Sequence, residues 1–167
     1  GGGGGALARR GLAGGARTDS LDSYKGRTYG FRVPVEVRWG DMDAMKHVNN
    51  VRYFVFFETA RLKHLEACGH LIDVTGPGPQ PILSSTSCRY RAPLTYPCDI
   101  QVGVCIDEVD ETSFTQHYAV FDQASKRVAA EGNGRIVFIN YDTGRREAIP
   151  SSILEKALAM QQPTSSL

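Results

Sequence analysis

Apolar and polar residues alternate from Phe31 to Trp39, a period of two that predicts a strand with one buried face. Pro34 lies within this strand and has no backbone donor, so we expect the strand at the edge of a sheet. Short polar stretches connect the last three of four later segments, which indicates hairpins and an antiparallel sheet. The four segments with the composition of strands are Ile82–Arg91, Ile100–Val109, Thr112–Phe121 and Arg127–Ile139.

Between the first strand and the other four, the apolar period becomes that of a helix. The pattern predicts a helix from about Asn49 or Asn50, one of which is the N-cap, to about Cys68, with Gly69 as its stop. Its predicted face is broader than an ordinary amphipathic stripe. The stripe consists of Val51, Phe54, Val55, Leu62 and Leu65, widened by Phe56, Phe57 and Ala60.

A helix this apolar must be covered, and one curved antiparallel sheet can wrap around it. Gly132 and Gly134 in the last strand give the backbone room for a bend or a close approach. Ser152 and Glu155 form a capping-box signature for a short C-terminal helix that ends near Met160. The sequence therefore predicts the α+β class, with a curved sheet, one long central helix and a short C-terminal helix.

The beginning of the chain differs in composition from the rest. Eight of the 18 glycines lie within residues 1–15, and the first 18 residues contain arginine but no acidic residue. We therefore expect residues 1–24 to be a disordered Gly/Arg-rich extension that is dispensable for folding. A remnant of an organellar transit segment and a plain extension both fit. Residues 25–162 form the predicted domain, and residues 163–167 a tail.

Composition and charge exclude several classes of protein. A formal net charge of +1 without a basic cluster makes nucleic acid an unexpected partner. No apolar run approaches the ~20 residues that span a membrane. The four cysteines fit no metal spacing, so we expect reduced thiols and no metal. We expect an intracellular, soluble protein in the cytoplasm or in an organelle, a plastid or a mitochondrion.

Two carboxylates, Asp41 and Asp43, lie in the polar loop that leads into the predicted long helix. A helix start offers free backbone N–H groups and the positive end of a dipole, which stabilise negative charge on a carbonyl oxygen. A nearby aspartate can act as a nucleophile or as a general base for water. The loop and the helix start thus supply both parts of an acyl-transfer site. The alternative is that both aspartates only shape a turn.

The loop and its surroundings resemble a known family. The segment Val37–Tyr53, followed by Glu58–Arg61, is similar to the 4-hydroxybenzoyl-CoA thioesterase family of hot-dog fold enzymes, and especially to its long-chain acyl-CoA thioesterase branch. The resemblance continues at Tyr90–Leu94, Asp99 and Ile149–Pro150, and it covers about residues 30–160.

This resemblance implies roles for individual residues. Asp43 takes the position of the catalytic carboxylate, and Asn50 that of the amide that polarises the carbonyl. Two positions depart from the family: Lys46 replaces a common glycine, and Asn50 replaces a histidine found in several relatives. His47 then either orients Asp43 or the substrate, or only packs the loop. Lys46 either contacts a coenzyme phosphate or is solvated.

Glu58 is a second candidate carboxylate, because it falls on the predicted apolar stripe of the helix. A buried carboxylate is costly unless it is paired or used. A second lineage of hot-dog thioesterases has its catalytic glutamate about one turn into the helix. The alternative is an ion pair with Arg61 or Arg52.

Together these features predict a thioesterase that hydrolyses acyl-CoA or acyl carrier protein thioesters, without a cofactor beyond that part of the substrate. Tyr53, Phe54 and Phe57 are the expected walls for the acyl chain. The resemblance further implies a homodimer or homotetramer with sites at the subunit interface. A non-catalytic acyl-binding or scaffold protein, and a hydratase or dehydratase on the same fold, are the alternatives.

Overall fold

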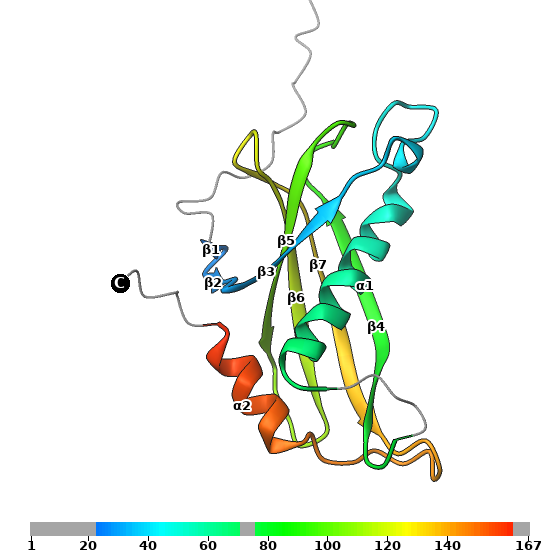
Figure 1. Ribbon diagram of the computed structural model, residues 1–167, viewed down its shortest axis with the longest axis vertical. Helices are drawn as coiled ribbons and strands as arrows, with labels where there is room; N and C mark the ends of the chain where they lie inside the picture. The colour runs from blue at the N-terminus through cyan, green and yellow to red at the C-terminus, as the bar shows by residue number, and fades with distance from the viewer. Residues whose placement is uncertain (1–22, 71–75, 162–167) are drawn as a thin grey trace, which may run out of the picture.

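The computed structural model describes residues 23–70 and 76–161. Residues 1–22 of the predicted N-terminal extension and the predicted tail, residues 163–167, lie outside the described residues. The described elements follow one another along the chain as shown in Figure 1. They are β1 (Ser23–Tyr24), β2 (Arg27–Thr28), β3 (Phe31–Glu36), the 3₁₀ turn η1 (Trp39–Asp41), α1 (Asn50–Ala67), β4 (Gln80–Tyr90), β5 (Asp99–Asp107), β6 (Ser113–Asp122), β7 (Arg127–Ile139) and α2 (Ser151–Ala159).

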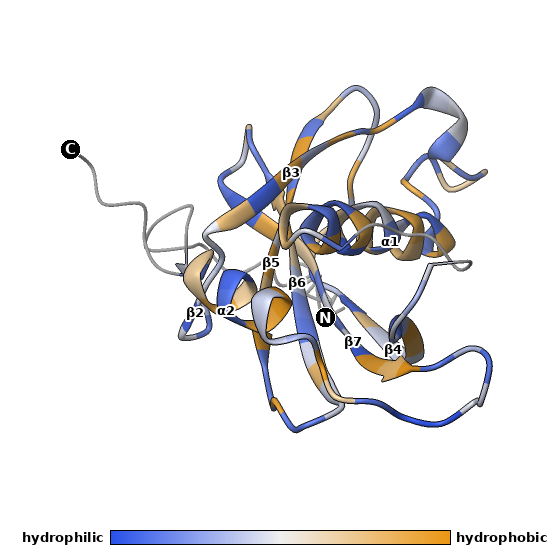
Figure 2. Cartoon of the chain, turned by 60° about the horizontal axis from the view of Figure 1, so that its bottom comes forward, coloured by the Kyte–Doolittle hydropathy of each residue, from blue (hydrophilic) through white to orange (hydrophobic). Residues whose placement is uncertain are grey.

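Five strands form one antiparallel sheet in the order β3-β5-β6-β7-β4. The sheet curves around α1, as the view along the molecule shows (Figure 2). This arrangement confirms the predicted α+β class, and β3, which contains Pro34, is an edge strand as expected. β3 ends at Glu36 rather than at Trp39, because the Asp41 amide donates to the Arg38 carbonyl (2.9 Å) and closes the turn η1.

The predicted limits of the long helix are confirmed, but its predicted buried face is partly wrong. α1 begins after the N-cap Asn49, and Gly69 follows its end with a φ of +88°. Val51 and Val55 are 60% and 43% exposed. The side chains that face the sheet are spaced three and four apart and include the larger rings, which bury more area than valine. They are Tyr53, Phe56, Phe57, Ala60, His64 and Leu65.

α1 approaches the sheet closely at Gly132 of β7. The Phe57 ring stacks on Tyr118 of β6, with the ring centroids 4.8 Å apart. A Cβ atom on Gly132 would lie 2.5 Å from the Phe57 ring and 2.4 Å from the Ser87 carbonyl oxygen. A Cβ on Gly134 would lie 2.8 Å from Leu83. The predicted role of these two glycines in close approach is confirmed.

The β1–β2 hairpin covers part of the face of the sheet opposite α1. Tyr24 and Tyr29 are buried there in a cluster with Phe121 of β6. Tyr29 meets the edge of the Phe121 ring, with centroids 5.7 Å apart. Ser23 and Tyr24 were expected in the disordered extension, but they form β1, because pairing with β2 places the Tyr24 ring in this cluster.

α2 packs beside the C-terminal half of α1, where Ile153 and Ala157 join a buried cluster with Leu65. The predicted capping box of Ser152 and Glu155 is wrong. The helix begins at Ser151, and its N-cap is Pro150, whose side chain makes no capping hydrogen bond. Neither helix of the described segments is long and apolar enough to cross a membrane.

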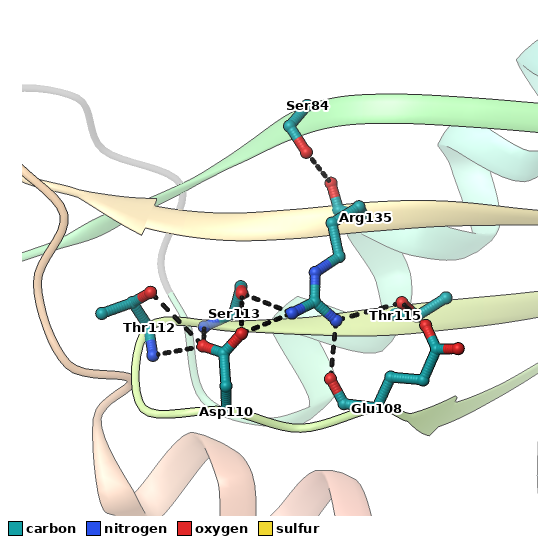
Figure 3. A network of polar contacts seen from close by, with 7 residues as sticks. All are labelled: Ser84, Glu108, Asp110, Thr112, Ser113, Thr115 and Arg135. Atoms are coloured by element: carbon teal, nitrogen blue, oxygen red, sulfur yellow. Dashed lines mark hydrogen bonds and ion pairs between the residues drawn. The ribbon is translucent and has the colours of Figure 1, made fainter.

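A polar network fastens the turn between β5 and β6 to β7 (Figure 3). The Arg135 guanidinium donates to the Asp110 carboxylate (2.5 Å), to Ser113 Oγ (2.7 Å) and to the Glu108 carbonyl (2.6 Å). The Ser84 hydroxyl of β4 donates to the Arg135 carbonyl (3.2 Å). This network stabilises the end of the sheet remote from the loop before α1.

The packing at Gly132 predicts a specific stability loss. Gly132→Ala forces a methyl group into space held by the Phe57 ring and a backbone oxygen, so the free energy of unfolding should fall by at least about 2 kcal/mol. Gly40→Ala is the control, because a Cβ there meets nothing within 4 Å. Urea unfolding measures both. Equal stability of the two variants would contradict the close approach.

Candidate active site

The loop between β3 and α1 is held in a tight turn around Asp43. The Asp43 amide donates to the His47 carbonyl (3.0 Å), and the Lys46 amide donates to the Asp43 carbonyl (2.9 Å). The Val48 amide donates to the Leu94 carbonyl (2.9 Å), which fixes the loop to the segment after β4. Asp43 is therefore presented at the beginning of α1 by backbone hydrogen bonds.

Lys46 has a φ of +62°, in the left-handed region. Side chains other than glycine enter this region at a cost of about 1–2 kcal/mol. The turn thus keeps the backbone conformation for which the resembling sequences use glycine. The Lys46 side chain is exposed, and it forms no ion pair within 4 Å among the described residues.

The Asp43 carboxylate is half-buried and oriented by two donors. Its Oδ1 accepts from the Met45 amide (2.8 Å), and its Oδ2 lies 3.4 Å from Asn49 Nδ2. The first bond is the turn contact that the alternative interpretation predicts. The Met45 amide, however, occupies only one of the two carboxylate oxygens. No cationic side chain of the described residues lies within ion-pair distance of either oxygen. The Asp43 carboxylate therefore lies near the N-cap of α1 without a cationic partner among the described residues.

Asn49 has a role that the sequence did not reveal. As the N-cap of α1, its Oδ1 accepts from the Val51 amide (3.0 Å), while its Nδ2 reaches toward Asp43. Its own amide donates to the Asp41 carbonyl (2.9 Å). The N-cap preference of asparagine indicated half of this role. The contact to Asp43 depends on the fold of the loop.

The two aspartates have different surroundings. The Asp41 side chain is only 10% exposed; its Oδ1 lies 3.1 Å from Arg52 Nε, and its Oδ2 accepts from the Arg38 amide (2.8 Å). Both carboxylate oxygens of Asp41 therefore have partners, and the side chain holds the loop to the first turn of α1. Asp43, in contrast, faces a cleft.

This cleft, called here the helix-start cleft, has a volume of about 370 Å³. The Asn50 amide is the first N–H of α1, and no acceptor for it exists among the described hydrogen bonds. The Tyr90 hydroxyl donates to the Asn50 carbonyl (3.0 Å), and the Tyr90 ring meets Tyr53 with centroids 5.2 Å apart. The cleft is lined by Asp43, Met45, His47, Val48, Asn50, Tyr53, Tyr90, Arg91, Ala92 and Pro93.

A second cleft, called here the loop cleft, has a volume of about 570 Å³. Asp43 is the one residue that lines both clefts. The loop cleft is lined by Trp39, Met42, Asp43, Ala44, Lys46 and Thr95. A carboxylate at the junction of two clefts suits a substrate with two arms that meet at the reacting carbon.

Only some of the other predicted site residues line the two clefts. His47 is exposed at the helix-start cleft, where its carbonyl holds the Asp43 amide. Tyr53 lines this cleft as expected, but Phe57 is buried in the core and, like the half-buried Phe54, lines neither cleft. Glu58 was expected on the buried stripe, yet its side chain is 57% exposed, 3.9 Å from Arg61. α1 buries a different face from the predicted one, and Glu58 therefore lies on the exposed side of the helix.

Burial disfavours ionisation of the four cysteine thiols. Burial raises the pKa of Cys68 and of Cys88 to about 11 and that of Cys105 to about 12, and it also raises the pKa of Cys98. All four thiols are therefore protonated at neutral pH. Within residues 23–70 and 76–161, no cluster of three or more histidine, cysteine or acidic side chains is placed to hold a metal.

Comparisons with known proteins agree with this fold. Residues 37–157 match the Thioesterase-like superfamily, and the chain belongs to that family. A protein of Aquifex aeolicus (strain VF5), provisionally described as an esterase, is 28% identical over 120 residues, which are 71% of this chain and 91% of that protein.

Two solved structures are also similar. The PA5185 protein of Pseudomonas aeruginosa strain PAO1 is 33% identical, with a TM-score of 0.69, over 81% of this chain and 94% of that one. The BH1999 gentisyl-coenzyme A thioesterase is 25% identical, with a TM-score of 0.66, over 75% of this chain and 98% of that one. These matches confirm the hot-dog fold.

The double role of Asn49 predicts how its variants behave. Asn49→Ala removes the cap and should lower the free energy of unfolding by about 1 kcal/mol. Asn49→Ser retains a capping oxygen and should stay within about 0.5 kcal/mol of the wild type, although it lacks the donor toward Asp43. Thermal or urea unfolding measures the difference. Equal stability of the two variants would show that the cap does not hold α1.

Proposed function

We propose that this protein hydrolyses acyl-coenzyme A thioesters at Asp43. Membership of the Thioesterase-like superfamily supports thioester hydrolysis in general. The observation that supports the finer assignment is the position of the Asp43 carboxylate, which lines the helix-start cleft together with Asn50, the first residue of α1, and has no cationic partner among the described residues. The name of the similar BH1999 structure, a gentisyl-coenzyme A thioesterase, supports coenzyme A rather than a carrier protein.

In the proposed reaction, the thioester carbonyl oxygen binds at the Asn50 amide and the positive end of the α1 dipole. Negative charge that develops on this oxygen is stabilised there. Asp43 either attacks the carbonyl carbon or takes a proton from water that attacks it. If Asp43 attacks, the carbon–sulfur bond breaks to leave an acyl–Asp43 anhydride, which water hydrolyses to the free acid and the Asp43 carboxylate. If water attacks, the carbon–sulfur bond breaks and gives the acid directly. In both cases the thiolate leaves and takes up a proton from the water.

The two clefts match the two arms of such a substrate. The acyl arm occupies the helix-start cleft, whose walls include Tyr53 and Tyr90. The thiol arm occupies the loop cleft, where Lys46 supplies a positive charge for the coenzyme and Trp39 an apolar wall. The reaction needs no cofactor beyond the coenzyme that the substrate carries.

We further propose that two copies associate along β4. This strand is an edge strand, and most of its side chains are exposed. The neighbouring face of α1 exposes Val51 and Val55, which a second copy would cover. Sedimentation should therefore report a dimer or a larger assembly. Val55→Glu should shift it toward the monomer, whereas Lys63→Glu on the exposed surface of the same helix should not. A fully active wild-type monomer would contradict this arrangement.

Asp43→Asn tests the catalytic assignment. Asparagine preserves size and hydrogen bonding but removes the charge, so turnover of acyl-CoA, followed by thiol release, should fall at least ~100-fold with little change in KM. Glu58→Gln makes the same chemical change on the exposed side of α1 and should leave turnover within about twofold.

Asp41→Asn separates positioning from chemistry. It weakens the contact with Arg52 and should lower stability more than turnover. Unchanged turnover in Asp43→Asn together with its loss in Glu58→Gln would move the site into the helix. Absence of thiol release with every acyl-CoA would overturn the proposed function.

A further inference from the structure

A small cavity lies between the C-terminal half of α1 and the beginning of β4, both of which supply lining residues. Its volume is about 150 Å³, and it shares no lining residue with the helix-start cleft or the loop cleft. Much of its wall is apolar, including Leu62 and Leu65 of α1 and Ile82 and Leu83 of β4. The proposed reaction at Asp43 does not use this cavity.

Polar side chains from three segments line this apolar cavity: Arg61 from α1, His70 from the segment after it, and Gln80 from β4. His70 and Gln80 are buried. Burial lowers the pKa of His70, against a smaller opposing effect of Gln80, so the imidazole is neutral at pH 7. Its Nε2 atom is buried and has no hydrogen-bond partner in the described chain. A buried polar atom in this state costs about 1–3 kcal/mol until something pairs with it.

Arg61 is also incompletely compensated. Its side chain is only 13% exposed, and its Nη2 lies 3.9 Å from Glu58 Oε1, beyond hydrogen-bond distance. No other carboxylate of the described residues lies within 4 Å of it. The Tyr118 phenol, whose pKa burial raises to about 12, is a neutral neighbour. A guanidinium largely removed from water favours an anion that completes its hydrogen bonds.

We propose that this cavity binds a carboxylate carried on a short apolar chain. The planar guanidinium of Arg61 matches two carboxylate oxygens, and the neutral His70 ring donates to one of them in the tautomer that carries its proton on Nε2. The leucine and isoleucine walls contact the hydrocarbon. The space equals that of about five water molecules, which suits a carboxylate with a few carbons and excludes a nucleotide.

Titration with sodium pentanoate, followed by the NMR signals of the His70 ring, tests the site in the full chain. Pentanoate should bind saturably below about 20 mM, and pentan-1-ol, which has no charge, at least about tenfold more weakly. Arg61→Met should weaken pentanoate binding at least about tenfold, whereas Lys63→Met, an exposed lysine of the same helix, should change it less than about twofold.

A second variant tests the site independently in case Arg61→Met does not fold. Leu83→Trp, at a partly exposed wall, fills the cavity and leaves Arg61 and His70 in place. It should abolish pentanoate binding. Equal binding of pentanoate and pentan-1-ol, unchanged binding in a folded Arg61→Met or Leu83→Trp variant, or no saturable binding would overturn the proposal.

The carboxylate has two possible sources: the far end of a substrate acyl chain or a separate acid. Arg61 lies 11 residues beyond Asn50, about 16 Å along α1, so only a long chain reaches it. If the substrate supplies the carboxylate, which rests on the proposed function, Arg61→Met should lower kcat/KM at least about tenfold for dodecanedioyl-CoA but not for dodecanoyl-CoA. Loss of pentanoate binding with both values unchanged assigns a separate acid. Pentanoate binding without thiol release from any acyl-CoA retains the site and rejects only the proposed function.

Discussion

The closeness of α1 to the sheet at Gly132 determines where the rest of the molecule lies. The Phe57 ring occupies space that a side chain on β7 would need, so the helix lies deep in the curved sheet. At this depth the first turn of α1 reaches the end of β4, where the Tyr90 hydroxyl bonds to the Asn50 carbonyl. The helix start is thereby fixed against a strand, and Asn50 and Tyr90 both line the helix-start cleft.

The two aspartates in the loop before α1 have different partners. Asp41 is enclosed and paired with Arg52, so its negative charge serves the structure of the helix start. Asp43 accepts hydrogen bonds from Met45 and Asn49 but has no cationic partner among the described residues. This difference in partners is what the proposed function uses to assign a structural role to Asp41 and the reactive role to Asp43.

The sequence preferences of helix caps, helix ends and edge strands predicted most of the helix and strand positions, because these preferences depend on only a few neighbouring residues. The asparagine cap, Gly69 and Pro34 lie where capping and strand chemistry place them. The buried face of α1 was harder to predict, since apolar residues occur around much of the helix and only contact with the sheet selects among them. For the same reason Glu58 was expected to be buried.

The site was predictable only in part. The resemblance selected Asp43 over Asp41, and residue types alone left both open. The link from Asn49 to Asp43 depends on the folded loop, and the cavity at Arg61 and His70 depends on α1 and β4 lying side by side. Neither relation leaves a periodic or spacing signal in the sequence.

The central claim is that a thioester carbonyl binds at the backbone N–H of Asn50 beside Asp43. The most direct test is the ¹⁵N–¹H spectrum of the protein titrated with a ketone analogue of acyl-CoA, in which CH₂ replaces the thioester sulfur and the carbonyl remains. The account predicts that the Asn50 amide signal moves downfield on saturation, with smaller changes along the Asp43 loop. Saturable binding that leaves the Asn50 signal unmoved would contradict it.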